Sequence, residues 1–193
     1  MVSELVIIGG GASGFMGAIT AISSGVRSVV ILESTLKVLE KVRISGGGRC
    51  NLTNSCLEIS NLVKNYPRGE KQLIGLFNRF STADAFEWFQ MKGLSLKVEK
   101  DGRVFPSSDS SEEVIKCLRD VAKEAGVKVH TNSHVKQIDL TKEGFNLLVK
   151  GNSLYKAKNI LICTGGHPSG RRLAKSLGHS IVQPVPSLFS FSS

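Results

Sequence analysis

The feature of the sequence that most constrains its fold is a glycine-rich turn directly after a short apolar segment. Residues 4–8 (Glu-Leu-Val-Ile-Ile) are nearly all apolar, which is typical of a strand buried on both faces of a parallel sheet. Residues 9–14 (Gly-Gly-Gly-Ala-Ser-Gly) satisfy G-x-G-x-x-G, and small and apolar residues at helical spacing follow over 13–24. A strand, a tight turn and a helix in this order predict the first unit of a Rossmann-type dinucleotide-binding domain.

Each glycine of this motif has a separate expected task. Gly9 permits the tight turn, Gly11 lets a pyrophosphate approach the backbone, and Gly14 allows close packing of helix on strand. The free N–H groups of the helix N-terminus stabilise the pyrophosphate. Glu33 lies 19 residues beyond Gly14, after the apolar strand predicted at 28–32, where a carboxylate can accept hydrogen bonds from an adenosine ribose. This favours FAD or NAD over NADP; the alternative is a plain turn and a solvated strand end.

A second glycine-rich segment runs from Ser45 to Asn51. Consecutive glycines at 46–48 can turn successive N–H groups toward one anion, and Arg49 adds positive charge. We prefer a cofactor-facing loop to a flexible linker, because polar side chains follow directly. Residues 164–166 (Thr-Gly-Gly) after the apolar strand at 159–163 would let the chain pass close to a dinucleotide, although such a glycine pair is common in α/β proteins.

Composition narrows the class of protein. The 193 residues suffice for one sizeable core, so one domain, or an incomplete larger one, is expected. The net charge is +9, and the Lys and Arg residues are scattered along the chain among 16 acidic residues. Only two Tyr and one Trp are present to stack on bases. This favours a basic surface that attracts anionic cofactors over nucleic-acid binding. The apolar runs are far below the ~18 residues that cross a bilayer, and no secretory signal precedes the first strand. A cytoplasmic protein without membrane contact is expected.

The cysteines and histidines predict no further site. The four cysteines form no CxxC pair and have no histidine at metal-ligand spacing, so we expect reduced thiols and no metal. Cys50 and Cys56 follow the second strand, where flavin-linked disulfide reductases place a redox pair, but five residues separate them. We therefore interpret them as ordinary thiols, and we assign the isolated histidines no catalytic or ligand role.

Periodicity predicts the remaining elements of an α/β fold with a parallel sheet and a small antiparallel excursion. Residues 34–56 are expected to be mostly loop. Helices are predicted at 70–80, 82–92, 110–125 and 171–177, the third opened by a capping box at Ser110 to Glu113. A hairpin is predicted around Asp101-Gly102, a strand within 127–138, and an antiparallel pair at 145–149 and 154–157 before the strand at 159–163.

Residues 41–54 carry a resemblance to a known family. Their sequence is similar to the pattern K-x-x-x-S-G-G-G-R-C-N-x-T-N of the BaiN/YhiN-like flavoproteins, which are described as NAD(P)/FAD-dependent oxidoreductases or aminoacetone-oxidase-type FAD-binding enzymes. Residues 102–106, 178–181 and 186–188 also resemble family landmarks. The resemblance implies a glutathione-reductase-like domain that binds FAD, with NAD(P)H as a possible electron donor. No catalytic side chain is identified, and the substrate is unknown.

The resemblance and the motifs together give a set of expected cofactor-binding residues. It implies Glu33 at the adenosine ribose, Val135 near the adenine, and Lys41 with the 45–51 loop near the cofactor. The full set is Gly9, Gly11, Ala12, Ser13, Gly14, Glu33, Lys41, Ser45, Gly46, Gly47, Gly48, Arg49, Cys50, Asn51, Val135, Thr164, Gly165 and Gly166.

Length is the main departure from the family, whose members are about twice as long. We therefore expect an N-terminal Rossmann-type FAD-binding portion over 1–186 with a helical and hairpin insertion at about 57–109, and the start of a missing second domain at 187–193. The leading hypothesis is a truncated FAD-dependent oxidoreductase. The alternatives are an NAD-linked dehydrogenase and a catalytically inert nucleotide-binding module.

Overall fold

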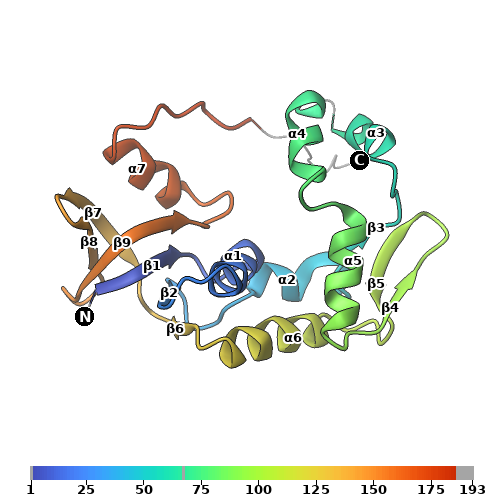
Figure 1. The fold of residues 1–193 in the computed structure, drawn as a ribbon, viewed down its shortest axis with the longest axis horizontal. Coiled ribbons are helices and arrows are strands. Elements are labelled where there is room, and N and C mark those ends of the chain that lie inside the picture. The colour runs from blue at the N-terminus through green and yellow to red at the C-terminus, as the bar shows by residue number, and fades with distance from the viewer. Residues whose placement is uncertain (1, 67, 186–193) are drawn as a thin grey trace, which may run out of the picture.

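A six-stranded sheet organises the chain in the computed structural model, which describes residues 2–66 and 68–185 (Figure 1). Its strand order is β6-β2-β1-β9-β8-β7. The first four of these strands are parallel to one another, whereas β8 pairs antiparallel with both β9 and β7. The strands are β1 (Val2–Ile8), β2 (Val29–Leu32), β6 (Lys128–His130), β7 (Val135–Thr141), β8 (Gly144–Val149) and β9 (Leu154–Ile162).

Helices follow the parallel strands. Helix α1 (Ala12–Ser23) connects β1 to β2, α6 (Ser111–Glu124) precedes β6, and α7 (Pro168–Ser176) follows β9. This alternation of parallel strands and helices confirms the predicted Rossmann-type α/β fold.

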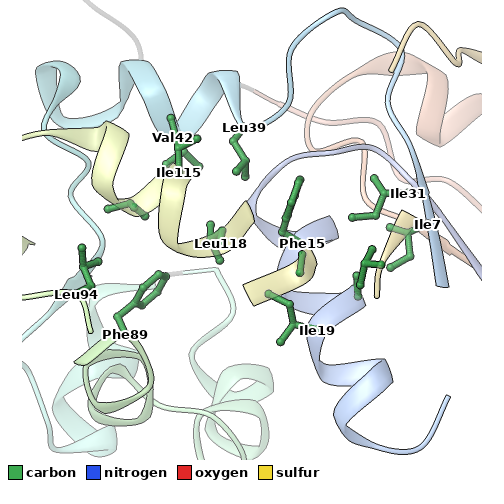
Figure 2. Close-up of a cluster of buried hydrophobic side chains, with 14 of the residues drawn as sticks. Ile7, Phe15, Ile19, Ile31, Leu39, Val42, Phe89, Leu94, Ile115 and Leu118 are labelled. Carbon is green, nitrogen blue, oxygen red and sulfur yellow. The ribbon is translucent and has the colours of Figure 1, made fainter. Parts of the chain in front are cut away.

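The central strand is buried on both faces, as the apolar run predicts. Ile7 belongs to a core cluster that α1 and α6 complete with side chains such as Phe15 and Leu118 (Figure 2). Val6 and Ile8 belong to a second cluster, formed with β7, β8 and α7. Alternate residues of β1 therefore anchor the two faces, which fixes the register of the strand and the position of the turn at its end.

The rest of the chain forms a helical and hairpin segment. It contains α2 (Glu40–Ile44), η1 (Ser45–Gly48), α3 (Ile59–Leu62), η2 (Val63–Asn65), α4 (Glu70–Phe77) and α5 (Thr82–Met91). A separate antiparallel sheet has the order β3-β5-β4, with β3 (Thr53–Asn54), β4 (Leu96–Val98) and β5 (Arg103–Pro106). Figure 1 shows α4, α5 and this small sheet on the side of the molecule opposite β7 and β8.

Several local predictions were wrong. Residues 34–56 contain the short elements α2, η1 and β3, which the prediction of mostly loop did not include. The segment 127–138 is two strands, because the chain leaves the sheet after His130 and Asn132 adopts a left-handed φ of 51°. The predicted strands at 154–157 and 159–163 are the single strand β9, which pairs with β1 on one side and β8 on the other.

Helix starts also differ in detail from the prediction. Ser110 caps α6 by accepting a bond from Glu112 N, whereas the reciprocal capping box is found at Ser81 and Asp84, at the start of α5. Both arrangements satisfy free N–H groups of a first helical turn.

Candidate functional site

The turn between β1 and α1 needs glycine at two positions for steric reasons. Gly9 has a φ of +113°, and a Cβ there would lie 2.4 Å from Cys163 O. A Cβ on Gly14 would lie 2.1 Å from Gly9 O. Both distances are far shorter than real contacts, so Gly9 permits the turn and Gly14 the close packing of helix on strand.

Gly11 differs from its neighbours because open space surrounds it. A Cβ built on Gly11 would have no heavy atom within 4 Å. Gly11 is the N-cap of α1 and makes no side-chain capping bond. The N–H groups of the first turn, at Ala12 and Ser13, therefore have no capping side chain and face a space that a ligand can enter.

Glu33 is held against the same turn. Its Oε2 accepts a hydrogen bond from Gly10 N at 2.7 Å, and its Oε1 accepts one from Thr35 N at 2.8 Å. The hydroxyls of Ser34 and Thr35 also donate to Oε1. Partial burial raises the pKa of Glu33, but these bonds outweigh it and hold the pKa below its ordinary value. Glu33 is thus an ionised acceptor, and Oε2 retains a lone pair for a further donor.

A cavity of about 1070 Å³ opens from this turn. That volume is slightly above the usual range for ligand pockets, about 300–1,000 Å³. Most of the predicted cofactor-binding residues line it, although they come from distant parts of the sequence. They are Gly9, Gly11, Ala12, Ser13, Glu33, Lys41, Ser45, Cys50, Asn51, Val135, Thr164, Gly165 and Gly166.

The loop after β9 forms a wall of this cavity together with α2. Gly165 has a left-handed φ of +58°, and a Cβ there would lie 3.6 Å from Lys41 Nζ. Lys41 therefore extends its ammonium group to residues 164–166, where it can attract an anion. Gly170 in α7 is equally constrained, because its Cβ would lie 2.0 Å from Thr164 Oγ1. Close packing of α7 on Thr164 fixes this wall.

The remaining predicted residues, Gly14, Gly46, Gly47, Gly48 and Arg49, do not line the cavity. Gly46 and Gly47 have left-handed φ values of 56° and 69°, so the 45–51 segment folds tightly and presents Ser45, Cys50 and Asn51 to the cavity. Contact of the glycines at 46–48 with a cofactor stays a prediction.

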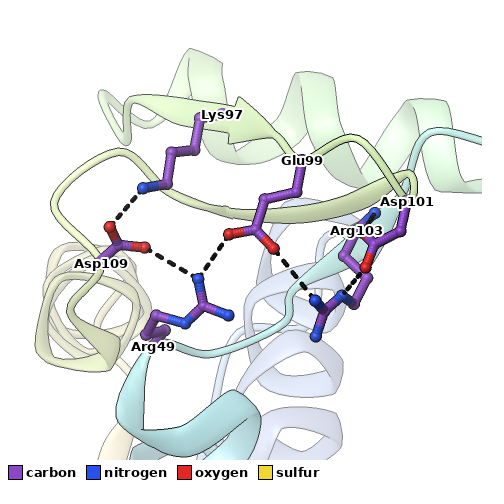
Figure 3. A network of polar contacts seen from close by, with 6 residues as sticks. All are labelled: Arg49, Lys97, Glu99, Asp101, Arg103 and Asp109. Carbon is purple, nitrogen blue, oxygen red and sulfur yellow. Dashed lines mark hydrogen bonds and ion pairs between the residues drawn. The ribbon is translucent and has the colours of Figure 1, made fainter.

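Arg49 faces away from the cavity, toward the hairpin of β4 and β5 (Figure 3). Its Nη1 donates to Glu99 Oε1 at 2.6 Å and lies 3.5 Å from Asp109 Oδ1. Its Cζ stacks 3.9 Å from the centroid of the Phe105 ring. These contacts hold the 45–51 segment on the hairpin, so the structure gives Arg49 a supporting position instead of the expected place beside an anion.

Sequence reasoning missed several residues that complete the site. Gly10 supplies the N–H that holds Glu33, and a Cβ there would lie 2.9 Å from Val38 Cγ1. The position of Thr35 two residues after Glu33 could have indicated its role, because its N–H and hydroxyl both bond the Glu33 carboxylate. Phe80 and Ala85, near α5, also line the cavity and had no signal in the sequence.

The cysteines occur as thiols. Cys50 and Cys163 both line the cavity, and burial raises the pKa of each thiol. Cys56 and Cys117 are also free. Within residues 2–66 and 68–185, no three His, Cys, Asp or Glu side chains gather as a metal site requires. Over the same residues, no helix has the length and apolar character to cross a membrane.

The parallel sheet, the uncapped glycine turn and the carboxylate after the second strand define the class of protein: a Rossmann-type dinucleotide-binding fold. The particular family follows from the sequence comparison. Residues 3–185 match the HI0933-like protein Rossmann domain, and the chain belongs to this family. The resemblance to BaiN/YhiN-like flavoproteins drawn from residues 41–54 is thereby confirmed.

Curated relatives agree with this placement. The 3-dehydro-bile acid delta(4,6)-reductase of Clostridium scindens is 33% identical over an alignment of 190 residues that covers 94% of this chain and 46% of the relative. The ribosomal RNA dihydrouridine synthase of Haemophilus influenzae is 26% identical over 98% of this chain and 49% of the relative. The chain thus spans about half the length of the curated relatives that it matches.

Solved structures show the same fold at low sequence identity. The Thermovibrio ammonificans THI4 structure superposes with a TM-score of 0.63 at 15% identity, over 92% of this chain and 64% of that one. A 3-ketosteroid-delta4-(5alpha)-dehydrogenase from Rhodococcus jostii also has a TM-score of 0.63, at 12% identity, over 90% of this chain and 48% of that one.

Proposed function

We propose that this chain is the FAD-binding part of an oxidoreductase and that the large cavity is its FAD site. The observation that carries the proposal is the combination of an uncapped α1 N-terminus, open space at Gly11, and the Glu33 carboxylate held at Gly10, all on one cavity. Amide N–H groups and a carboxylate in this arrangement suit the pyrophosphate and ribose of an adenine dinucleotide.

The residues present fit the adenosine diphosphate half of such a ligand. The N–H groups of Ala12 and Ser13 would bind the pyrophosphate, Glu33 Oε2 a ribose hydroxyl, and Val135 would contact the adenine. The ammonium of Lys41 would add positive charge at residues 164–166. Bound FAD supplies a ring that accepts and returns a hydride, while the protein positions it.

The relatives support redox chemistry. The bile acid reductase of Clostridium scindens, which is 33% identical to this chain, is named for a reduction. Because the chain spans about half of its curated relatives, the activity of the whole protein and its substrate are part of this proposal. We also propose NAD(P)H as the electron donor, a small-molecule substrate without a nucleic-acid or membrane partner, and a cytoplasmic location.

Specific observations also favour two other functions. An NAD-linked dehydrogenase is favoured by Glu33, because a carboxylate in this position also binds the ribose of NAD. A nucleotide-binding module without activity is the other alternative, because the chain spans about half the length of each curated relative.

Thermal unfolding with added nucleotides separates these functions. FAD at 100 times its Kd should stabilise the fold by about 2.7 kcal/mol. For a chain of this size the Tm should then rise by about 5–11 °C. The proposal predicts this rise with FAD and reduction of the bound flavin by NADH or NADPH. A rise with NAD and none with FAD would support the dehydrogenase, whereas FAD binding without reduction by any donor would support the inert module.

A further inference from the structure

A second, smaller cavity of about 390 Å³ adjoins the large one. Four residues line both cavities: Asn51, Leu52, Phe80 and Ala85. The two cavities therefore meet where the end of the 45–51 segment faces α5.

The junction lies far from the expected adenosine end of the large cavity. Glu33 follows β2 and Val135 begins β7, and both line only the large cavity. Figure 1 shows β7 and α5 on opposite sides of the molecule. If the ADP half of FAD binds at Glu33, the rest of the ligand extends toward α5 and the smaller cavity.

The smaller cavity has an uncharged lining, whereas Glu33 and Lys41 line the larger one. No charged side chain of this lining can pair with a charged ligand, so the cavity favours uncharged ligands. Three aromatic rings line it: the rings of Tyr66 and Phe77 lie 5.8 Å apart, and Phe80 lines the same cavity. Tyr66 and Phe80 are 44% and 46% exposed, which leaves apolar ring surface free to contact a flat ligand.

The polar part of the lining offers an anchor where the two cavities meet. Thr82 donates its hydroxyl to Cys56 O at 2.8 Å, and Ser81 is engaged in the cap of α5. Asn51 is exposed and lies at the junction of the two cavities. Its amide can donate and accept one bond to a ligand at that point.

We propose that the smaller cavity is the substrate pocket and that it selects an uncharged, flat ring compound bearing a polar atom. The ring lies against Tyr66 and Phe80, and the polar atom bonds the Asn51 amide. This proposal rests on the proposed FAD site, because the junction then brings the ring compound next to the flavin end of the large cavity.

Calorimetric titration of the full chain with naphthoquinone and with naphthoquinone sulfonate tests this pocket. Naphthoquinone is uncharged and flat, and the sulfonate adds one negative charge to the same rings. We expect naphthoquinone to bind, and its sulfonate to bind at least about tenfold more weakly. Equal affinity for the two compounds, or no binding of naphthoquinone, would overturn the proposal.

Variants locate the binding site. Tyr66→Ala and Phe77→Leu change residues that line only the smaller cavity, and each should weaken naphthoquinone about tenfold with FAD affinity unchanged. Leu140→Ala, at an exposed position of β7, should change neither affinity. Naphthoquinone affinity that is the same in all three variants as in the unaltered chain would refute the pocket.

The same samples distinguish the two proposals. If FAD fails to bind while naphthoquinone binding depends on Tyr66, the FAD proposal falls and the ring-compound pocket stands. If FAD binds while naphthoquinone binding ignores Tyr66, the pocket falls and the FAD site stands. Circular dichroism melting of each variant shows that the fold is retained.

Discussion

Substitution of glycine by alanine should lower the stability of the fold at Gly14 and the affinity for ADP at Gly11. In Gly14→Ala the new Cβ would lie 2.1 Å from the backbone oxygen of Gly9. Overpacking costs typically about 1–3 kcal/mol, and the upper end applies because backbone atoms must move. Alanine returns about 1 kcal/mol of helix propensity. The net loss is about 2 kcal/mol, which lowers the Tm by about 4–8 °C.

Gly11→Ala places its Cβ in open space, so the fold should tolerate it. The backbone of Gly11 has a φ of −87°, which alanine adopts readily, and alanine is a poorer N-cap than glycine by about 0.5 kcal/mol. The Cβ would nevertheless keep a pyrophosphate from the N–H groups of α1. Loss of one hydrogen bond to a charged group, about 1.5–3 kcal/mol, should weaken ADP about 10- to 100-fold.

Circular dichroism melting and calorimetric titration with ADP measure the two effects separately. The expected pattern is a large fall in Tm for Gly14→Ala and a large fall in ADP affinity at nearly unchanged Tm for Gly11→Ala. ADP affinity in Gly11→Ala equal to that of the unaltered chain would refute the reasoning about the pyrophosphate. An unchanged Tm in Gly14→Ala would refute the reasoning about packing.

Two further predictions concern charged residues. Because hydrogen bonds keep the folded pKa of Glu33 low, its carboxylate stabilises the fold above the unfolded pKa, about 4.3, and that stability is lost as the pH falls through the folded pKa. Glu33→Gln should thus lower the Tm at neutral pH and leave it unchanged in acid. The control Glu143→Gln, on the exposed β7–β8 turn, should lower the Tm at neither pH. A Tm difference between Glu33→Gln and the unaltered chain that is equal at both pH values would contradict this. Arg49→Ala should weaken FAD about tenfold without changing ADP affinity, because Arg49 supports only the 45–51 side of the cavity. The control Arg103→Ala, which also removes a cation that contacts Glu99, should change the affinity for neither FAD nor ADP. If Arg49→Ala lost as much affinity for ADP as for FAD, the whole fold would be disturbed.

The sequence predicts best what short stretches of chain determine. The β1–α1 turn follows from Gly9, which has a positive φ, and from Gly14, which packs against the backbone of Gly9 a few residues away. The hairpin turn at Gly102, with a φ of +83°, and the helix after Ser110 are equally local. The place of Glu33 at the turn follows from the fixed length of a strand-helix-strand unit.

Long-range pairing explains what the sequence does not predict. The direction of Arg49 depends on Glu99, 50 residues away, so the charge of the 45–51 segment is neutralised by a hairpin that motif reasoning treats separately. Strand β9 is continuous because β1 and β8 pair along its two edges, which hydrophobic periodicity alone does not reveal. Phe80 reaches both cavities only because α4 and α5 fold beside the 45–51 segment.

A crystal structure of the chain grown with FAD is the most direct test of the central claim. We predict pyrophosphate oxygens within hydrogen-bond distance of the Ala12 and Ser13 N–H groups, and a ribose hydroxyl on Glu33 Oε2. FAD bound away from the β1–α1 turn, or a ribose that makes no contact with Glu33, would contradict the account.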